Sequence, residues 1–269
     1  MNRGRTIAQR LAYVEPQLGA RDQLVIGALD RVRLATTVQL HRLLVMAPEP
    51  STLRRTQALL ARLVRLGVVT RLERRVGGVR SGSAGQVYAL DTLGQRLASA
   101  CGPAGGRRLR RPWTPGLLFV THQLGVAEVY VGLREAERAG RLTLLDFDAE
   151  PLSWRAFAGL GGARTILKPD AFVRLGLGEF EDRYFIEVDQ ATESLPALVR
   201  KLTVYRRYYA TGREQGRAGA FPAVMFLVPS EARRDAVAAL IAKQSAEVQR
   251  FAAVALASDA PHLFTQGVA

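Results

Sequence analysis

The amino-acid sequence predicts a mixed α/β (α+β) fold in two domains, and three observations lead to this prediction. Residues 21–100 carry three helix-like apolar patterns followed by a strand–turn–strand pattern. Residues 101–116 are rich in glycine, proline and arginine and show no apolar periodicity, which marks a linker. Residues 117–269 then follow the order αβββαβ, with one further helix and strand. The first residues, 1–20, are expected to form an irregular arm.

The first domain begins with three helices. Apolar residues at helical spacing predict a helix over residues 21–33 and a shorter one over residues 38–45. A third helix is expected to start at Ser51, a natural N-cap, and to end at Gly67, a typical helix-ending glycine. Its polar face carries Arg54, Arg55, Gln57 and Arg62.

A hairpin is expected after the third helix. Strand-like runs at residues 68–75 and 86–90 flank a tip rich in glycine and serine, and a further helix starts at Thr92. Three helices followed by a hairpin is the order of a winged helix-turn-helix domain. In that domain the third helix enters the major groove, so we expect the four polar side chains named above to contact DNA. The hairpin arginines expected to hold phosphates are Arg71, Arg74, Arg75 and Arg80.

The net positive charge of the chain lies entirely in its N-terminal part. Residues 1–115 hold 20 arginines and 6 acids, whereas residues 116–269 hold 18 basic and 18 acidic residues. Such a concentrated basic field raises the local concentration of a polyanion, and double-stranded DNA is the expected partner. Three alternatives stay open at this point: a solubility effect with merely solvated arginines, an anionic membrane surface, and a protein-interaction module.

Cysteine content and hydropathy narrow the cellular setting. The single cysteine, Cys101, excludes an internal disulfide and a cysteine-rich zinc site. No apolar run approaches the roughly 18 residues that a membrane span requires, and the start of the chain lacks the apolar core of a signal peptide. We therefore expect a cytoplasmic protein that is not associated with a membrane.

The second domain is predicted to alternate helices and strands. A long apolar-striped pattern opens it, and short apolar runs separated by polar turns follow. The expected helices cover residues 117–139, 195–209 and 231–245, and the expected strands cover residues 141–146, 171–175, 183–189, 223–228 and 251–256.

Two neighbouring strands of this domain each carry acids. Asp170 precedes one strand, while Glu187 and Asp189 end the next strand on the same face. Pairing of these strands would bring Asp170 near Glu187. Two carboxylates with water molecules form a typical oxygen site for Mg²⁺ or Mn²⁺, which can polarise a phosphodiester. Because acids in an otherwise apolar strand are costly unless paired, we favour a functional site over a solvated one.

The element order and the "KPD…EVD" spacing resemble the PD-(D/E)XK nuclease superfamily, which implies a restriction-endonuclease-like fold. More closely, the chain resembles the replication-relaxation family of actinobacterial plasmids and mobile elements. This resemblance rests on the segments "THQLGVAEVYVGL", "LKPDAFVRL", "FIEVDQATES" and "RKLTVYRRYY" behind a winged helix. By the nuclease pattern, Asp170 and Glu187 would be metal ligands, and Glu128 on the first helix of the domain would complete the site.

The chain departs from the nuclease pattern at one position. The superfamily lysine normally stands two residues after the acid, where this chain has Asp189. Lys201 on the following helix is the candidate replacement, and Lys168 is another. The predicted catalytic set is therefore Asp170, Glu187, Asp189 and Lys201.

Two functional hypotheses follow, with a third behind them. The first is a metal-dependent DNA endonuclease or nickase that the winged helix targets, associated with the nucleoid or with a plasmid. The second is a non-catalytic DNA-binding initiator or regulator with a degenerate nuclease-like domain, and the third is an assembly factor. A homodimer is an open alternative. Further candidate DNA contacts on the helix after the acids are Tyr205, Arg206, Arg207, Tyr208 and Tyr209.

Overall fold

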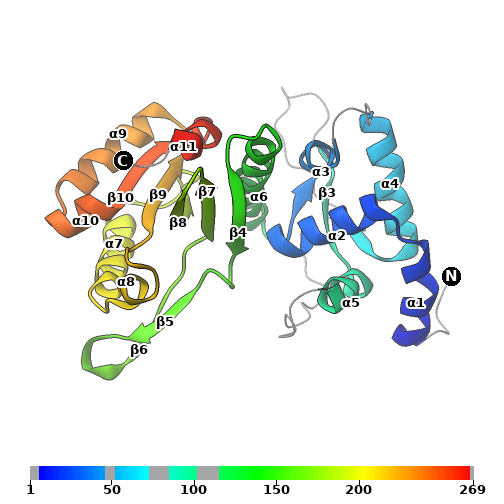
Figure 1. Ribbon diagram of the computed structural model, residues 1–269, viewed down its shortest axis with the longest axis horizontal. Helices are drawn as coiled ribbons and strands as arrows, with labels where there is room; N and C mark the ends of the chain where they lie inside the picture. Colours follow the sequence, from blue (N-terminus) through cyan, green and yellow to red (C-terminus); the bar gives the residue numbers. More distant parts are fainter. Residues whose placement is uncertain (1–5, 46–51, 73–84, 102–114, 267–269) are drawn as a thin grey trace. The chain divides into compact units, whose positions relative to one another are not determined.

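The computed structural model describes residues 6–45, 52–72, 85–101 and 115–266. The contacts divide the chain into two compact units, Met1–Val131 (unit 1) and Gly132–Ala269 (unit 2). Both units mix helices with sheets, which confirms the predicted α/β class (Figure 1). The boundary falls inside helix α6, Leu117–Arg138, and not at the predicted linker, most of which lies outside the described residues.

Unit 1 packs helices around a small antiparallel sheet. Its three strands are arranged in the order β1-β3-β2, with Ala35 paired to Tyr88 and Val69 paired to Leu90. The short strand β1 was not predicted. The elements in chain order are α1 (Ile7–Val14), η1 (Glu15–Gln17), α2 (Ala20–Val32), β1 (Ala35–Thr36), α3 (Thr37–Leu44), α4 (Leu53–Leu66), β2 (Val69–Arg71), β3 (Val87–Leu90) and α5 (Thr92–Cys101).

The first residues of the chain correct a prediction. The expected irregular arm contains helix α1, because the Thr6 side chain accepts a hydrogen bond from the Gln9 backbone and Gln9 caps Thr6 in return. This reciprocal cap satisfies two backbone donors at the start of the helix.

Local sequence explains where helix α4 begins and ends. Thr52, and not the predicted Ser51, is the N-cap, and its hydroxyl accepts from the Arg55 backbone. The helix ends at Gly67, whose φ of +72° favours a residue without a side chain. Gly94 allows helix α5 to approach the strand region, since a Cβ there would lie 2.1 Å from the Val68 carbonyl oxygen.

Unit 2 is built on a five-stranded sheet in the order β10-β9-β8-β7-β4. Strands β4, β7 and β8 pair antiparallel, whereas β8, β9 and β10 pair parallel. Its strands are β4 (Thr143–Ala149), β5 (Arg155–Ala158), β6 (Arg164–Leu167), β7 (Ala171–Leu177), β8 (Phe180–Val188), β9 (Ala223–Val228) and β10 (Ala252–Leu256). Its further helices are α7 (Leu195–Tyr209), α8 (Arg213–Ala218), α9 (Glu231–Ala242), α10 (Ala246–Phe251) and α11 (Ala260–Gln266).

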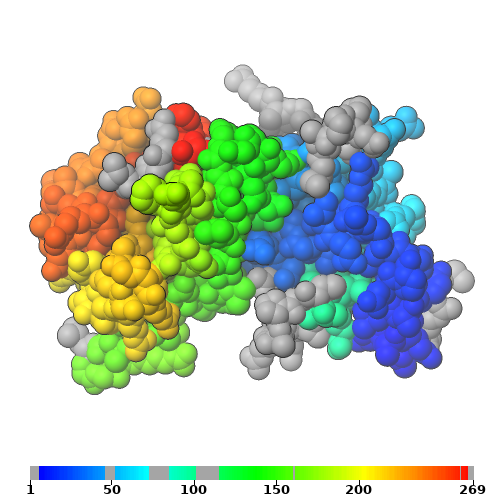
Figure 2. All heavy atoms as spheres, in the orientation of Figure 1, coloured from blue at the N-terminus to red at the C-terminus, as the bar shows by residue number. Residues whose placement is uncertain are grey.

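Strands β5 and β6 form a separate two-stranded sheet, which was not among the strands expected from the sequence. This hairpin lies beside helices α7 and α8 at the surface of the unit (Figures 1 and 2). Three residues, ending with Asp170, connect it to the start of β7.

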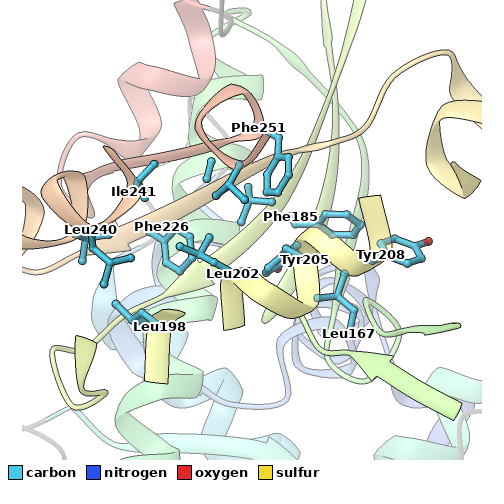
Figure 3. Close-up of a cluster of buried hydrophobic side chains, with 14 of the residues drawn as sticks. Leu167, Phe185, Leu198, Leu202, Tyr205, Tyr208, Phe226, Leu240, Ile241 and Phe251 are labelled. Atoms are coloured by element: carbon cyan, nitrogen blue, oxygen red, sulfur yellow. The ribbon is translucent and has the colours of Figure 1, made fainter. Parts of the chain in front are cut away.

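The main core of unit 2 fills the space between the sheet and helix α7 (Figure 3). Aromatic and aliphatic side chains from the sheet, α7 and α9 meet there, including Phe185, Leu202, Phe226 and Ile241. Each large apolar side chain that is fully buried in such a core stabilises the folded state by roughly 1.5–3 kcal/mol. The carboxylates described next lie in the same layer.

Candidate functional site

Strand pairing brings Asp170 and Glu187 side by side on one face of the sheet. Ala171 pairs with Ile186, and the Asp170 backbone donates to the Ile186 carbonyl at 3.0 Å. The Asp170 Oδ2 atom accepts a hydrogen bond from the Val188 backbone at 2.7 Å. Since alternate residues of a strand share a face, both acids point toward α7, as Phe172 does. The sequence-based expectation that these two strands pair is met.

Helix α7 supplies two donors to Glu187. The Lys201 Nζ atom lies 2.7 Å from Glu187 Oε2, and the Tyr205 hydroxyl lies 2.5 Å from Glu187 Oε1. Lys201 and Tyr205 are four residues apart, so they lie on one face of the helix. The helix is positioned by Ser194, whose hydroxyl caps it by accepting from the Ala197 backbone.

Burial and charge shift the pKa values of this cluster. Glu187 is only 1% exposed, and burial together with the nearby Asp170 charge raises the pKa of its carboxyl to about 7, against the opposing effect of Lys201 and Tyr205. Although burial acts to lower it, the pKa of Lys201 is raised because Glu187 and Asp170 stabilise the ammonium. The pKa of Tyr205 is also raised, chiefly by burial, so its hydroxyl stays protonated and donates to Glu187. The cluster therefore holds a fixed cation beside two acids.

The structure distinguishes between the two candidate lysines. Lys201 contacts Glu187 and also lies 3.2 Å from Glu193. Lys168 is exposed instead, and its ammonium lies 4.8 Å from the centre of the Trp154 ring. The lysine beside the carboxylates is thus the one on helix α7.

Asp189 has a different set of partners from Asp170 and Glu187. It forms an ion pair at 2.6 Å with Arg233 of α9, and it accepts from the Ala191 backbone at 2.8 Å. Ala191 has a φ of +57°, a conformation that L-residues rarely adopt and that this bond helps to hold. These contacts hold the loop between β8 and α7, and the catalytic role expected of Asp189 stays a prediction.

Glu128 contacts residues other than the two acids of the predicted metal site. Its carboxylate accepts from Gln39 Nε2 at 3.0 Å and forms an ion pair with Arg42, both on helix α3 of unit 1. Across the described part of the chain, no group of three or more histidine, cysteine or acidic side chains is placed to hold a metal ion. The contacts of Glu128 with Gln39 and Arg42 lie within unit 1, and its role as a metal ligand stays a prediction.

Beside the acids lies a second buried network that the sequence did not reveal. Arg155 of β5 donates to Glu214 Oε1 at 3.1 Å, and the Tyr208 hydroxyl donates to the same oxygen at 2.5 Å. The guanidinium lies 4.7 Å from the centre of the Phe172 ring. Tyr205 and Tyr208 are buried, which corrects their suggested role in gripping DNA. Their spacing with Lys201, at i, i+4 and i+7, was the signal for an inward-facing stripe.

In unit 1 the predicted DNA-contacting residues separate into three groups. Arg54, Arg55 and Gln57 of α4 and Arg71 of β2 are exposed. Arg62 instead forms an ion pair with the buried Asp22 and donates to the Gln17 carbonyl at 3.2 Å, so it fixes α4 to the start of α2. The predicted wing contacts Arg74, Arg75 and Arg80 lie outside the described residues.

Comparisons with known proteins give one match. Neither the curated proteins nor the solved structures contain a significant relative. In the described ranges, no helix is both long and apolar enough to cross a membrane. A family model described as replication-relaxation matches residues 26–224, more than half of the chain and parts of both units. The chain belongs to the replication-relaxation family.

Proposed function

We propose that this protein acts on plasmid or mobile-element DNA, with unit 1 binding the duplex and unit 2 nicking or cutting it with the help of a divalent metal. The family description, replication-relaxation, supports a role in DNA replication or relaxation. The observation that carries the catalytic part is the convergence of Asp170, Glu187 and Lys201 on one face of the sheet.

Unit 1 has the element order of a winged helix. Helices α3 and α4 follow α2, and the strands β2 and β3 pair as a hairpin after α4. In such a domain the helix before the hairpin enters the major groove, and this helix exposes Arg54, Arg55 and Gln57. Arginine and glutamine can pair with guanine and adenine edges respectively.

The acids of unit 2 suit Mg²⁺ or Mn²⁺. Mg²⁺ in nucleic-acid enzymes is held by one or two carboxylates together with substrate phosphate oxygens and water. Asp170 and Glu187 would supply these carboxylates. When bound, the metal would polarise the phosphodiester and lower the pKa of an attacking water molecule.

The side chains around the acids then have separate tasks. The Lys201 ammonium stays charged and is 28% exposed, so it can interact with charge that develops on a phosphate, an effect worth several kcal/mol in related sites. Tyr205 is a positioning residue, because its hydroxyl orients the Glu187 carboxylate from inside the core. Arg233 and Asp189 hold the loop that leads from β8 to α7.

One observation favours a second candidate function. Both oxygens of Glu187 already accept hydrogen bonds, and its side chain is almost fully buried. A carboxylate compensated in this way can also serve as a purely structural charge. The second candidate is therefore a DNA-binding initiator or regulator that retains the fold without cleaving DNA.

A plasmid-nicking assay separates the two functions. Supercoiled plasmid carrying the cognate site would be incubated with the full chain and Mg²⁺, Mn²⁺ or a chelator. We expect metal-dependent nicking that Asp170→Asn and Glu187→Gln abolish, while both variants keep their affinity for DNA. The matched control is Glu179→Gln, an exposed acid in the turn between β7 and β8, which should nick at the normal rate. Nicking by Glu187→Gln at the wild-type rate would exclude this site, and DNA binding with no nicking under any metal would favour the second candidate.

A further inference from the structure

The surface formed by the end of α7 and by α8 is strongly basic, although residues 116–269 contain equal numbers of bases and acids. Residues 203–220 hold four arginines and a single acid, Glu214. All four arginines are exposed: Arg206, Arg207, Arg213 and Arg217.

The one acid of this segment does not neutralise the surface. Glu214 is only 5% exposed, and its carboxylate accepts from Arg155 and from the Tyr208 hydroxyl inside the unit. Its charge is thus compensated by the partly buried Arg155 guanidinium. The four exposed arginines keep their full positive charge toward solvent.

The hairpin β5–β6 extends the same surface. Residues 155–168 contain no acid, and on β6 the side chains of Arg164 and Ile166, with Lys168 just beyond the strand, face solvent while Leu167 is buried. Arg213 ties the hairpin to α8 by donating to the Ala156 carbonyl at 2.7 Å. Figure 2 shows the hairpin adjoining α7 and α8 on one face of the molecule. We call this the basic surface of unit 2; it comprises Arg164, Lys168, Arg206, Arg207, Arg213 and Arg217.

We propose that the basic surface of unit 2 binds the phosphodiester backbone of DNA that flanks the site at Asp170 and Glu187. The inference rests on the proposed function and adds a second DNA contact, made by the unit whose basic and acidic residues nearly balance, 18 against 17. Segregation of cations onto one face creates a local field that attracts a polyanion even when the whole unit is nearly neutral.

The position of the surface links it to the acids. Lys168 stands two residues before Asp170, and Arg206 stands five residues after Lys201 on the same helix. Five residues of helix span roughly 7.5 Å. A DNA strand presents a phosphate about every 3.4 Å of rise, so this segment matches about two phosphates. The surface thus begins two residues from Asp170 along the chain and about 7.5 Å from Lys201 along the axis of α7.

The test compares two triple variants of the full chain. Arg206→Ala/Arg207→Ala/Arg217→Ala removes three cations of the basic surface; Arg213 is kept because it holds the hairpin. The matched control, Arg141→Ala/Lys243→Ala/Arg250→Ala, removes three exposed cations elsewhere in unit 2 and changes the net charge equally. Binding to a fluorescently labelled duplex is measured by anisotropy in the presence of EDTA, at salt concentrations between about 50 and 300 mM. Over about this range the affinity of a protein for DNA phosphates changes strongly with salt.

We expect the slope of log K against log salt to be shallower by about 2–3 units in the surface variant, since each neutralised phosphate contributes about 0.9 to this slope. Its affinity for the duplex near 0.1 M salt should fall at least about tenfold. The control should change the slope by less than about one unit. Thermal unfolding checks that both variants fold as the wild type does. Equal slopes for the two variants would overturn the inference and favour an acidic protein as the partner of this surface. That result leaves the proposed function intact, whereas failure of the unmodified chain to bind any duplex overturns both.

Discussion

Unit 1 exposes arginines along helix α4, whereas unit 2 buries its most distinctive charges between helix α7 and the sheet. On α4, Arg54 and Arg55 face solvent, and their charge is available to a ligand. In unit 2, Glu187 and Glu214 are buried and each is held by one cation and one tyrosine. Exposed charges should govern binding with little effect on folding. Buried charges should govern folding and chemistry together.

The largest effect on stability is expected at Arg155. Arg155→Ala leaves Glu214 buried beside Tyr208 without its cation, which should lower the free energy of unfolding by about 3–5 kcal/mol. Urea unfolding of the full chain measures this. The double variant Arg155→Met/Glu214→Gln should recover most of the loss, because neither member of the ion pair is then charged. A loss below about 1 kcal/mol for the single variant would show that the ion pair contributes no more to stability than an exposed surface pair does.

Lys201 provides a pH-dependent test of whether buried charges in unit 2 govern its folding. The pKa of Glu187 is raised above the ordinary value of 4.5 to about 7, so the stability that Glu187 contributes is present below about pH 4.5 and is lost as the pH rises through 7. Lys201→Met removes the cation that opposes this shift. We therefore expect a destabilisation of about 3 kcal/mol at pH 8 that falls toward about 1 kcal/mol at pH 5.

The control for this pH profile is Lys243→Met, which removes an exposed lysine. Its urea midpoint should differ from the wild-type midpoint by the same small amount at both pH values. If Lys201→Met destabilises the protein by the same amount at pH 5 and at pH 8, Glu187 does not titrate in the folded protein near neutral pH, which would contradict the prediction.

In unit 1, Arg62 tests whether a basic residue on α4 serves folding or DNA. Arg62→Ala should cost about 1–2 kcal/mol of stability, because it leaves the buried Asp22 carboxylate without its cation, with only the Gly19 backbone as a donor. Duplex affinity under folding conditions should remain at the wild-type level. A loss of affinity without a loss of stability would return Arg62 to the DNA interface.

Arg54 and Arg55 should behave in the opposite way. Their replacement by alanine should change stability by no more than about 0.5 kcal/mol. Binding to the preferred site should weaken by about 1–3 kcal/mol, and the sequence preference should relax. Arg71→Ala should weaken all duplexes alike, because it is expected to contact phosphate. Competition binding against a randomised duplex library measures both effects, and an unchanged preference in the α4 variants would contradict the proposed docking.

How far the sequence alone could lead differs between elements. Helix α7 and strand β9 were predicted with the observed bounds, because a capping serine and an uninterrupted apolar run mark them clearly. The hairpin β5–β6 was missed because each of its strands has only four residues, too few for a clear alternation, and because the connection between them contains glycines at 159, 161 and 162. Helix α1 was missed because a helix of eight residues with one buried side chain gives little periodicity.

The site shows the same division. The pairing of Asp170 with Glu187 followed from two neighbouring strands, and Lys201 was a candidate from its place on the next helix. The partners of Asp189 and Glu128 could not be predicted, since Arg233 and Arg42 are 44 and 86 residues distant in the chain. Long-range ion pairs depend on the packing of whole elements, which local patterns do not encode. The role of Arg155 was hidden for the same reason.

The central claim is that Asp170 and Glu187 together hold a divalent metal at the DNA-bound site. Mn²⁺ binding can be followed directly by electron paramagnetic resonance, which distinguishes free from bound Mn²⁺. In the complex of the full chain with its duplex at pH 8, we predict a Mn²⁺ site that is lost in both Asp170→Asn and Glu187→Gln and retained in Glu179→Gln. Binding should also weaken at pH 6, because protons compete for Glu187. Equal Mn²⁺ binding by the wild type and the Glu187→Gln variant, or none by either, would contradict the claim.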